Sequence, residues 1–197
     1  MNQFETAPGA TPLQPEDLEG LIPRDLESKQ QLDEHEAENI LQAEVWSALQ
    51  IWTPEKLLSS SMIRRCHKEL FGKTWRWAGT YRKRETSIGV APEQISVLTE
   101  QLIGNTLYQI NESSEETKVV IARLHHQLVS IHLFPNGNGR HARFVCNILA
   151  SALSQELPTW GAKTLIAGPS SRQKYLSALR KADTTGELEL LVNFMWS

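Results

Sequence analysis

The chain has little of what marks a secreted or membrane-spanning protein. Its 197 residues include two cysteines, Cys66 and Cys146, which lie far apart and outside any Cys-x-x-Cys motif. Nothing in this cysteine usage demands an oxidising compartment. No apolar run approaches membrane-spanning length, and the polar, acidic N-terminal segment lacks a charged-then-apolar leader. We therefore expect one soluble domain with an extension, located in the cytoplasm.

Long basic runs are also missing, and the formal net charge is −3. This balance argues against a nucleic-acid scaffold, so we expect no direct nucleic-acid partner and no membrane partner. The histidines His125, His126 and His141 show no spacing typical of a transition-metal site. We expect packing or surface roles for them.

Apolar residues recur at helical spacing through most of the chain, which predicts a mainly α fold. Residues 1–26 are rich in Pro, Gly and acidic residues and predict an extended arm. Thr53 is placed to cap a helix that has Pro54 at its first position. The plausible strand content is confined to residues 73–91, where we expect one small β-hairpin. The expected helices cover residues 28–50, 54–70, 93–110, 116–131, 139–155, 170–181 and 187–197.

Residues 132–143, His-Leu-Phe-Pro-Asn-Gly-Asn-Gly-Arg-His-Ala-Arg, carry most of the functional signal. His132 can take up a proton near neutral pH. Gly137 and Gly139 let backbone N–H groups approach an anion closely. Arg140 and Arg143 supply planar, permanently charged donors that match phosphate oxygens. The combination predicts phosphoryl or nucleotidyl chemistry.

The flanking pattern places this segment between two helices. Apolar positions run at helical spacing up to Ile131 and resume at Ala142, and Gly-Asn-Gly interrupts them. Arg140 then opens the second helix, whose free N–H groups and positive dipole end form an anion site. We expect His132, at the end of the first helix, to face the same anion.

At these residues the chain resembles the Fic/Doc (Fido) family, whose signature is His-x-Phe-x-[Asp/Glu]-Gly-Asn-Gly-Arg-x-x-Arg. The resemblance implies a Fic-type helical bundle with a β-hairpin flap. It also implies that His132 is the general base and that Phe134 anchors the loop in the core. The implied phosphate ligands are Gly137, Asn138, Gly139, Arg140 and Arg143.

One position departs from the signature. Asn136 stands where the family has an acidic Mg²⁺ ligand, and a hard cation prefers a carboxylate. An amide oxygen can still coordinate, so we expect Asn136 to be a weak metal ligand, with Mg²⁺ bridging the phosphates of ATP.

The similarity extends beyond the loop, over residues 55–197, which we expect to form the Fido domain after an N-terminal arm and helix at 1–54. The segment 77–89 resembles the family's approach to its flap, which implies that Thr86, Ser87, Ile88 and Gly89 hold the target in extended form. Tyr175 resembles the tyrosine near the nucleoside. The opening of the chain is similar to a small Fic subgroup, mobile mystery protein B.

A regulatory residue is also implied. Many Fic proteins are restrained by a helix with [Ser/Thr]-x-x-x-Glu-[Gly/Asn], whose glutamate pairs with the second motif arginine. Here Glu38-Asn39 supplies the second half of that pattern, and Glu34 occupies the Ser/Thr position. We expect Glu38 to occupy donors of Arg143 that ATP would need.

By this resemblance the chain is a protein adenylyltransferase, which moves AMP from ATP to a Ser, Thr or Tyr hydroxyl of a target protein. Two alternatives stay open. One is a phosphotransferase like the Doc toxins, and the other is a non-catalytic, nucleotide-binding regulatory module. A regulatory partner is compatible with each of them.

Overall fold

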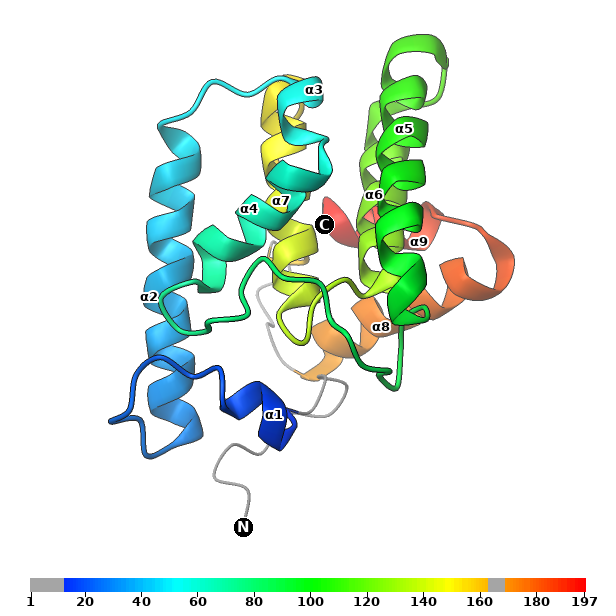
Figure 1. Ribbon diagram of the computed structural model, residues 1–197. Helices are drawn as coiled ribbons and strands as arrows, with labels where there is room; N and C mark the ends of the chain where they lie inside the picture. Colours follow the sequence, from blue (N-terminus) through cyan, green and yellow to red (C-terminus); the bar gives the residue numbers. More distant parts are fainter. Residues whose placement is uncertain (1–12, 163–168) are drawn as a thin grey trace.

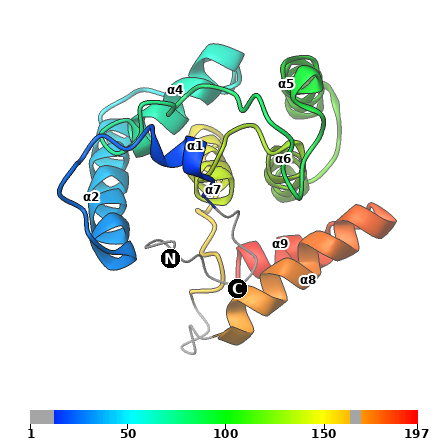
Figure 2. The ribbon, with the colours of Figure 1, turned by 60° about the horizontal axis from the view of Figure 1, so that its bottom comes forward.

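The computed structural model describes residues 13–162 and 169–197 and is mainly helical. Helix α7 lies in the middle, with α2 and α4 on one side and α6 and α5 on the other (Figure 1). Helices α8 and α9 pack together beneath α6, as the turned view shows (Figure 2). The helices are α1 (Pro15–Leu18), α2 (Lys29–Ala48), α3 (Pro54–Leu57), α4 (Ser60–Phe71), η1 (Pro92–Gln94), α5 (Ile95–Glu112), α6 (Thr117–Ile131), α7 (Asn138–Ala152), α8 (Pro169–Thr185) and α9 (Glu189–Met195).

The helical fold expected from the periodicity is therefore confirmed, and α6 and α7 begin and end within three residues of the expected bounds. These two helices pack along their lengths and form the centre of the core. Helix α7 is buried over much of its surface, because other helices cover it on both sides. The loop between α6 and α7 is consequently held at the middle of the molecule.

Local capping explains where the N-terminal helices begin. Ser28 caps α2 by accepting a hydrogen bond from the Gln31 N–H, in a capping box. Thr53 caps α3 with Pro54 at its first position, as expected. The single helix expected over 54–70 is divided at Leu58 and Ser59, since Ser59 caps a new helix, α4. Helix α2 packs against α4 and so reaches the central loop.

The hairpin expected within 73–91 does not form as paired strands in the described residues, which contain only an isolated bridge between Leu21 and Trp75. The backbone of this segment bonds to the end of α6 instead. The Arg82 N–H donates to the Leu133 carbonyl at 2.9 Å, and the Val90 N–H donates to the Ile131 carbonyl at 3.4 Å. We call residues 84–90 the flap segment.

Other expectations have simple outcomes. The expected arm at 1–26 lies partly outside the described residues, and its visible part contains the short helix α1. Cys66 and Cys146 are both buried and free. In the described ranges, no helix combines the length and apolar character that a membrane span requires.

Candidate active site

The loop between α6 and α7 starts with an unusual backbone conformation at His132. This residue ends α6 with φ 58° and ψ 64°, a left-handed conformation that is uncommon for a non-glycine residue. Its N–H still donates to the Leu128 carbonyl at 3.3 Å. The left-handed turn redirects the chain toward α7 and leaves the imidazole at the wall of a pocket.

Asn138 closes the loop through its side chain. Its Oδ1 accepts a hydrogen bond from the Phe134 N–H at 2.9 Å, and its Nδ2 donates to the Phe134 carbonyl at 2.8 Å. Asn138 is buried, and Phe134 is completely inaccessible to solvent. Both polar atoms of the amide thus shape the loop, while the backbone N–H of Asn138, at the start of α7, is left in the first turn of the helix.

A buried histidine that was not singled out from the sequence supports the same loop. The Gly79 N–H donates to His67 Nδ1 at 3.1 Å, so the ring proton is on Nε2, which donates to the Asn136 carbonyl at 3.0 Å. The His67 ring also stacks on Phe134, with centroids 3.8 Å apart. Burial, reinforced by His141, holds the pKa of His67 well below its ordinary value. Neutral His67 therefore ties the loop to the segment that precedes the flap.

The two motif glycines meet different demands. Gly137 has φ 78°, and a Cβ there would lie 2.6 Å from the Phe71 ring, so this glycine is required by the backbone and by packing. Gly139 is helical, and a Cβ there would meet no atom within 4 Å. The open space over Gly139 belongs to the pocket. A ligand can therefore approach the first turn of α7 closely at Gly139.

The pocket has a volume of about 500 Å³ and lies where the loop, α7, α8 and the flap segment meet. Three arginines line it, Arg140, Arg143 and Arg172, and its described lining includes no Asp or Glu. Much of the remaining lining is apolar or aromatic. The site therefore suits an anion that carries an apolar or aromatic group. The full lining is Ile88, Val129, His132, Asn136, Gly137, Asn138, Gly139, Arg140, Arg143, Trp160, Ser171, Arg172, Tyr175, Leu176, Leu179 and Phe194.

The pocket keeps His132 neutral. Burial is the main cause, and Arg82 and Arg84 add to it, so that the pKa falls from 6.5 to about 4. A hydrogen bond to the Val129 backbone opposes this change in part. At pH 7 the imidazole is therefore unprotonated and can accept a proton.

Arg143 is held by aromatic rings on the α8 side of the pocket. Its guanidinium lies 5.3 Å from the Trp160 centroid and 4.9 Å from the Tyr175 centroid. Arg143 also donates to the Tyr175 hydroxyl, whose oxygen forms a second hydrogen bond with His125 Nε2, 3.0 Å away. Burial lowers the pKa of Arg143. Tyr175 and Arg143 thus lie at the same pocket, as the resemblance implied.

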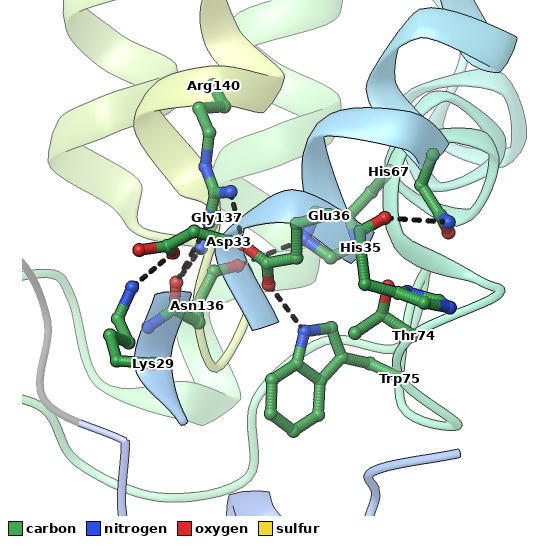
Figure 3. A network of polar contacts seen from close by, with 11 residues as sticks. Lys29, Asp33, His35, Glu36, His67, Thr74, Trp75, Asn136, Gly137 and Arg140 are labelled. Carbon is green, nitrogen blue, oxygen red and sulfur yellow. Dashed lines mark hydrogen bonds and ion pairs between the residues drawn. The ribbon is translucent and has the colours of Figure 1, made fainter. Parts of the chain in front are cut away.

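Arg140 is engaged by a glutamate, and that glutamate is Glu36. Figure 3 shows the Glu36 carboxylate between two donors: it forms an ion pair with Arg140 and accepts a hydrogen bond from Trp75 Nε1 at 2.7 Å. Glu36 is buried on the inner face of α2. Figure 3 also shows Asn136 beside this pair, with its Oδ1 3.5 Å from Arg140 Nη2.

The expectation for Glu38 is corrected by this arrangement. Two residues along a helix rotate the side chain by about 200°, so Glu38 is exposed when Glu36 points inward. The engaged partner is also the first motif arginine, whereas Arg143 is held by Trp160 and Tyr175. The ion pair expected between Glu38 and Arg143 is thus replaced in the structure by one between Glu36 and Arg140, and its inhibitory effect stays a prediction.

The residues present do not form a complete Mg²⁺ site. Asn136 Oδ1 accepts from the Gly137 N–H at 2.7 Å and is neutral. The nearby carboxylate of Glu36 is already bound by Trp75 and Arg140. Nor do the described residues bring together three His, Cys, Asp or Glu side chains that could hold a metal ion. Magnesium normally uses one or two protein carboxylates together with substrate phosphates, and among the described residues of this loop only the Asn136 amide is offered.

The flap segment lies directly beside His132. Ile88 lines the pocket, and a Cβ at Gly89 would lie 2.7 Å from His132 Cβ. Thr86 Oγ1 donates to the Ile88 carbonyl at 2.6 Å and so folds the segment locally, while Ser87 is exposed. The structure therefore brings the flap segment and His132 together.

Arg172 is a pocket residue that sequence reasoning missed. It lies in the first turn of α8, far along the chain from the motif. Its charge faces Arg143 and Tyr175, and it lowers the pKa of each in part. No spacing rule links residue 172 to the loop, so only the packing of α8 could have indicated it.

Comparisons with known proteins identify the region that carries the loop. The model of the Fic/DOC family matches residues 57–150. No functionally curated protein matches the chain. Glu36, Arg172 and Tyr175 lie outside the matched region.

Solved structures share the fold. The N-terminal Fic domain of a VirB-translocated Bep effector protein from Bartonella quintana, with bound ADP, has a TM-score of 0.67 and 19% identity, over 87% of this chain and 86% of that one. BepC from Bartonella tribocorum, with bound AMPPNP, has a TM-score of 0.67 and 18% identity, over 86% and 87%. Fic-1 (residues 134–508) from C. elegans has a TM-score of 0.64 and 20% identity, over 88% and 50%.

Proposed function

Residues 57–150 belong to the Fic/DOC family, and from this premise we propose that the protein is an adenylyltransferase acting on other proteins. It transfers AMP from ATP to a serine, threonine or tyrosine hydroxyl of its target. The observation that carries the proposal is a neutral His132 at the wall of a pocket whose described lining has three arginines and no carboxylate.

The reaction needs one proton transfer and one displacement. The target hydroxyl oxygen attacks the α-phosphorus of ATP, a new P–O bond forms, and the bond to the β-phosphate oxygen breaks. Pyrophosphate leaves, and the hydroxyl proton passes to the His132 imidazole. A base positioned in this way contributes on the order of 10²–10⁴-fold to the rate.

The pocket supplies positive charge and N–H donors that stabilise the negative charge of the ATP phosphates. Arg140, Arg143 and Arg172 offer guanidinium donors, and the first turn of α7 offers backbone N–H groups at Asn138 and Gly139. The apolar and aromatic lining residues, Tyr175 among them, take the nucleoside. The ADP and AMPPNP bound by the two Bartonella proteins of similar fold support nucleotide binding here.

Magnesium enters this proposal as part of the substrate. Since the described part of the chain offers Asn136 as an amide ligand and no free carboxylate beside it, the metal arrives on the triphosphate as MgATP and the protein holds it weakly. The step assigned to His132 does not depend on a metal held by the chain.

The mass of the adduct tests the reaction. The protein is incubated with MgATP and a proteome extract, and modified peptides are identified by mass spectrometry. An AMP adduct that is absent with His132→Ala supports the proposal. A phosphate adduct would instead identify a Doc-like phosphotransferase. ATP binding without any covalent product would identify a nucleotide-binding module.

A further inference from the structure

Arg82 is a buried arginine whose guanidinium binds backbone carbonyls on two sides. Only 2% of the residue is exposed. On one side, Nε donates to the His132 carbonyl at 2.6 Å and Nη2 to the Ile131 carbonyl at 3.3 Å. On the other side, Nη1 donates to the Arg84 carbonyl at 2.9 Å and Nη2 to the Val90 carbonyl. One side chain thus joins the end of α6 to both ends of the flap segment.

On the α6 side, Arg82 acts as a cap. The last carbonyls of a helix lack intrahelical partners, and a cation near them is favoured by the helix dipole. The carbonyls that Arg82 binds are those of Ile131, the last residue of α6, and of His132, the left-handed residue after it. A left-handed conformation is unfavourable for a non-glycine residue, so it needs contacts of this kind to persist.

On the flap side, Arg82 fixes the segment against the imidazole. Gly89 has φ 108°, and a Cβ there would lie 2.6 Å from Arg82 Nη2 and 2.7 Å from His132 Cβ. The absent side chain lets the flap backbone touch both residues at once. The distance between the flap segment and His132 is therefore set by the guanidinium between them.

We propose that Arg82 is a positioning residue: it holds His132 in its left-handed conformation and fixes residues 84–90 beside it. Arg82 does not contact the reacting atoms. Its effect on the reaction rests on the proposed role of His132 as the base, whereas its effect on the geometry does not.

The charge of Arg82 has a second consequence, because it faces the same imidazole as several other cations. Arg84 of the flap segment also acts on His132, and the pocket arginines come from α7 and α8. No Asp or Glu is among the described lining residues. After burial, Arg82 is the largest cause that lowers the pKa of His132. Loss of the Arg82 charge should therefore raise that pKa from about 4 toward 6.5.

Three variants separate charge from geometry. Arg82→Gln removes the positive charge and the guanidinium hydrogen bonds. Arg82→Lys keeps the charge but offers one nitrogen donor where the guanidinium offers three. Arg65→Gln is the matched control, because Arg65 is an exposed α4 residue paired with Glu69. NMR titration of the His132 ring and hydrogen exchange of the Arg82, Val90 and His132 amides need no catalytic activity.

The expected results differ among the variants. In Arg82→Gln, the three amides exchange at least tenfold faster and the His132 pKa rises. In Arg82→Lys, the amides exchange faster while the pKa stays near the wild-type value. In Arg65→Gln, neither changes. An active enzyme should also lose kcat in both Arg82 variants while KM for ATP is retained, since the phosphate contacts are untouched.

Unchanged amide exchange and an unchanged His132 pKa in Arg82→Gln would overturn the proposal. If Arg82→Gln does not fold, Gly89→Ala serves in its place, because the added Cβ would displace the guanidinium from His132. Protected amides in a folded Gly89→Ala variant would equally contradict it. Absence of AMP transfer in the wild type would refute the proposed function and leave these two measurements valid.

Discussion

For the proposed transfer, the protonation state of His132 sets the pH range of the reaction. Burial first, and Arg82 second, lower its pKa to about 4, so the imidazole is the neutral, active form at any pH well above that value. We expect kcat/KM for transfer to stay level from pH 8 to pH 6 and to fall as the pH drops through about 4 to 5. A pH profile with its acid limb near 6.5, the ordinary value for histidine, would contradict the buried environment described for His132.

Because the side chain at position 136 is neutral, we expect a negative charge there to strengthen Mg²⁺ binding. In Asn136→Asp, a carboxylate oxygen replaces the amide oxygen beside the triphosphate and can coordinate Mg²⁺. We expect tighter binding of MgATP relative to metal-free ATP, measured by calorimetry, together with faster transfer.

The Asn136→Ala variant controls for loss of the hydrogen bond to Gly137. If Asn136→Asp shows the metal dependence of the wild type, position 136 does not face the metal.

Alanine substitution of the two motif glycines should affect different properties, stability at Gly137 and ATP binding at Gly139. Gly137→Ala should destabilise the protein by about 1–3 kcal/mol, because φ 78° and the Phe71 ring oppose a Cβ. Gly139→Ala should leave stability intact and weaken ATP binding, because its Cβ projects into open pocket space. Denaturant unfolding and ATP titration check the pair. Equal loss of stability in both variants would mean that the space over Gly139 is not a ligand site.

At the scale of elements, helix α2 contacts Arg140 through the Glu36 ion pair, and we expect this contact to limit the access of ATP to Arg140. The Glu36→Gln variant keeps an acceptor for Trp75 Nε1 but loses the charge that pairs with Arg140. We expect the freed guanidinium to bind ATP more tightly and transfer to rise, and calorimetry with a labelling assay measures both. Glu38→Gln is the matched control on the same helix, and it should behave as wild type because Glu38 is exposed. A response to Glu38→Gln with none to Glu36→Gln would restore the assignment made from the sequence pattern.

The elements also show what the sequence could predict. Periodicity located α6 and α7 because their buried faces repeat at helical spacing, and Thr53-Pro54 marked the start of α3. The flap was expected as a hairpin because residues 73–91 have strand-like composition. The actual partners of its backbone are Ile131 and Leu133, some 40–50 residues away. In addition, the Arg82 guanidinium donates to the Val90 carbonyl, which a hairpin would need for strand pairing.

The candidate site was predictable only where it is continuous in sequence. His132 and the glycines and arginines of the motif lie within twelve residues, so their spacing revealed them. Glu36 was missed because a pattern match does not fix which side of α2 faces the loop. Arg172 and His67 were missed because each reaches the site through the packing of a separate helix.

At the scale of the whole molecule, the pocket depends on segments from most of the chain. Ile88 of the flap segment, the α6–α7 loop and Tyr175 of α8 all line it, and Glu36 of α2 reaches Arg140 from the side. The region matched by the family ends at residue 150. The loop between α6 and α7 therefore lies within the matched region, while Tyr175 and the Glu36 partner of Arg140 lie outside it.

The most direct measurement is transfer of label from ATP carrying ³²P in the α-phosphate, for the wild type and for His132→Ala. We expect the wild type to label protein and His132→Ala to lose on the order of 10²–10⁴-fold in rate, with ATP affinity unchanged. His126→Ala is the control, because His126 pairs with Asp183 away from the pocket lining. Equal labelling by wild type and His132→Ala, or labelling only from the γ-phosphate, would contradict adenylyl transfer with His132 as the base.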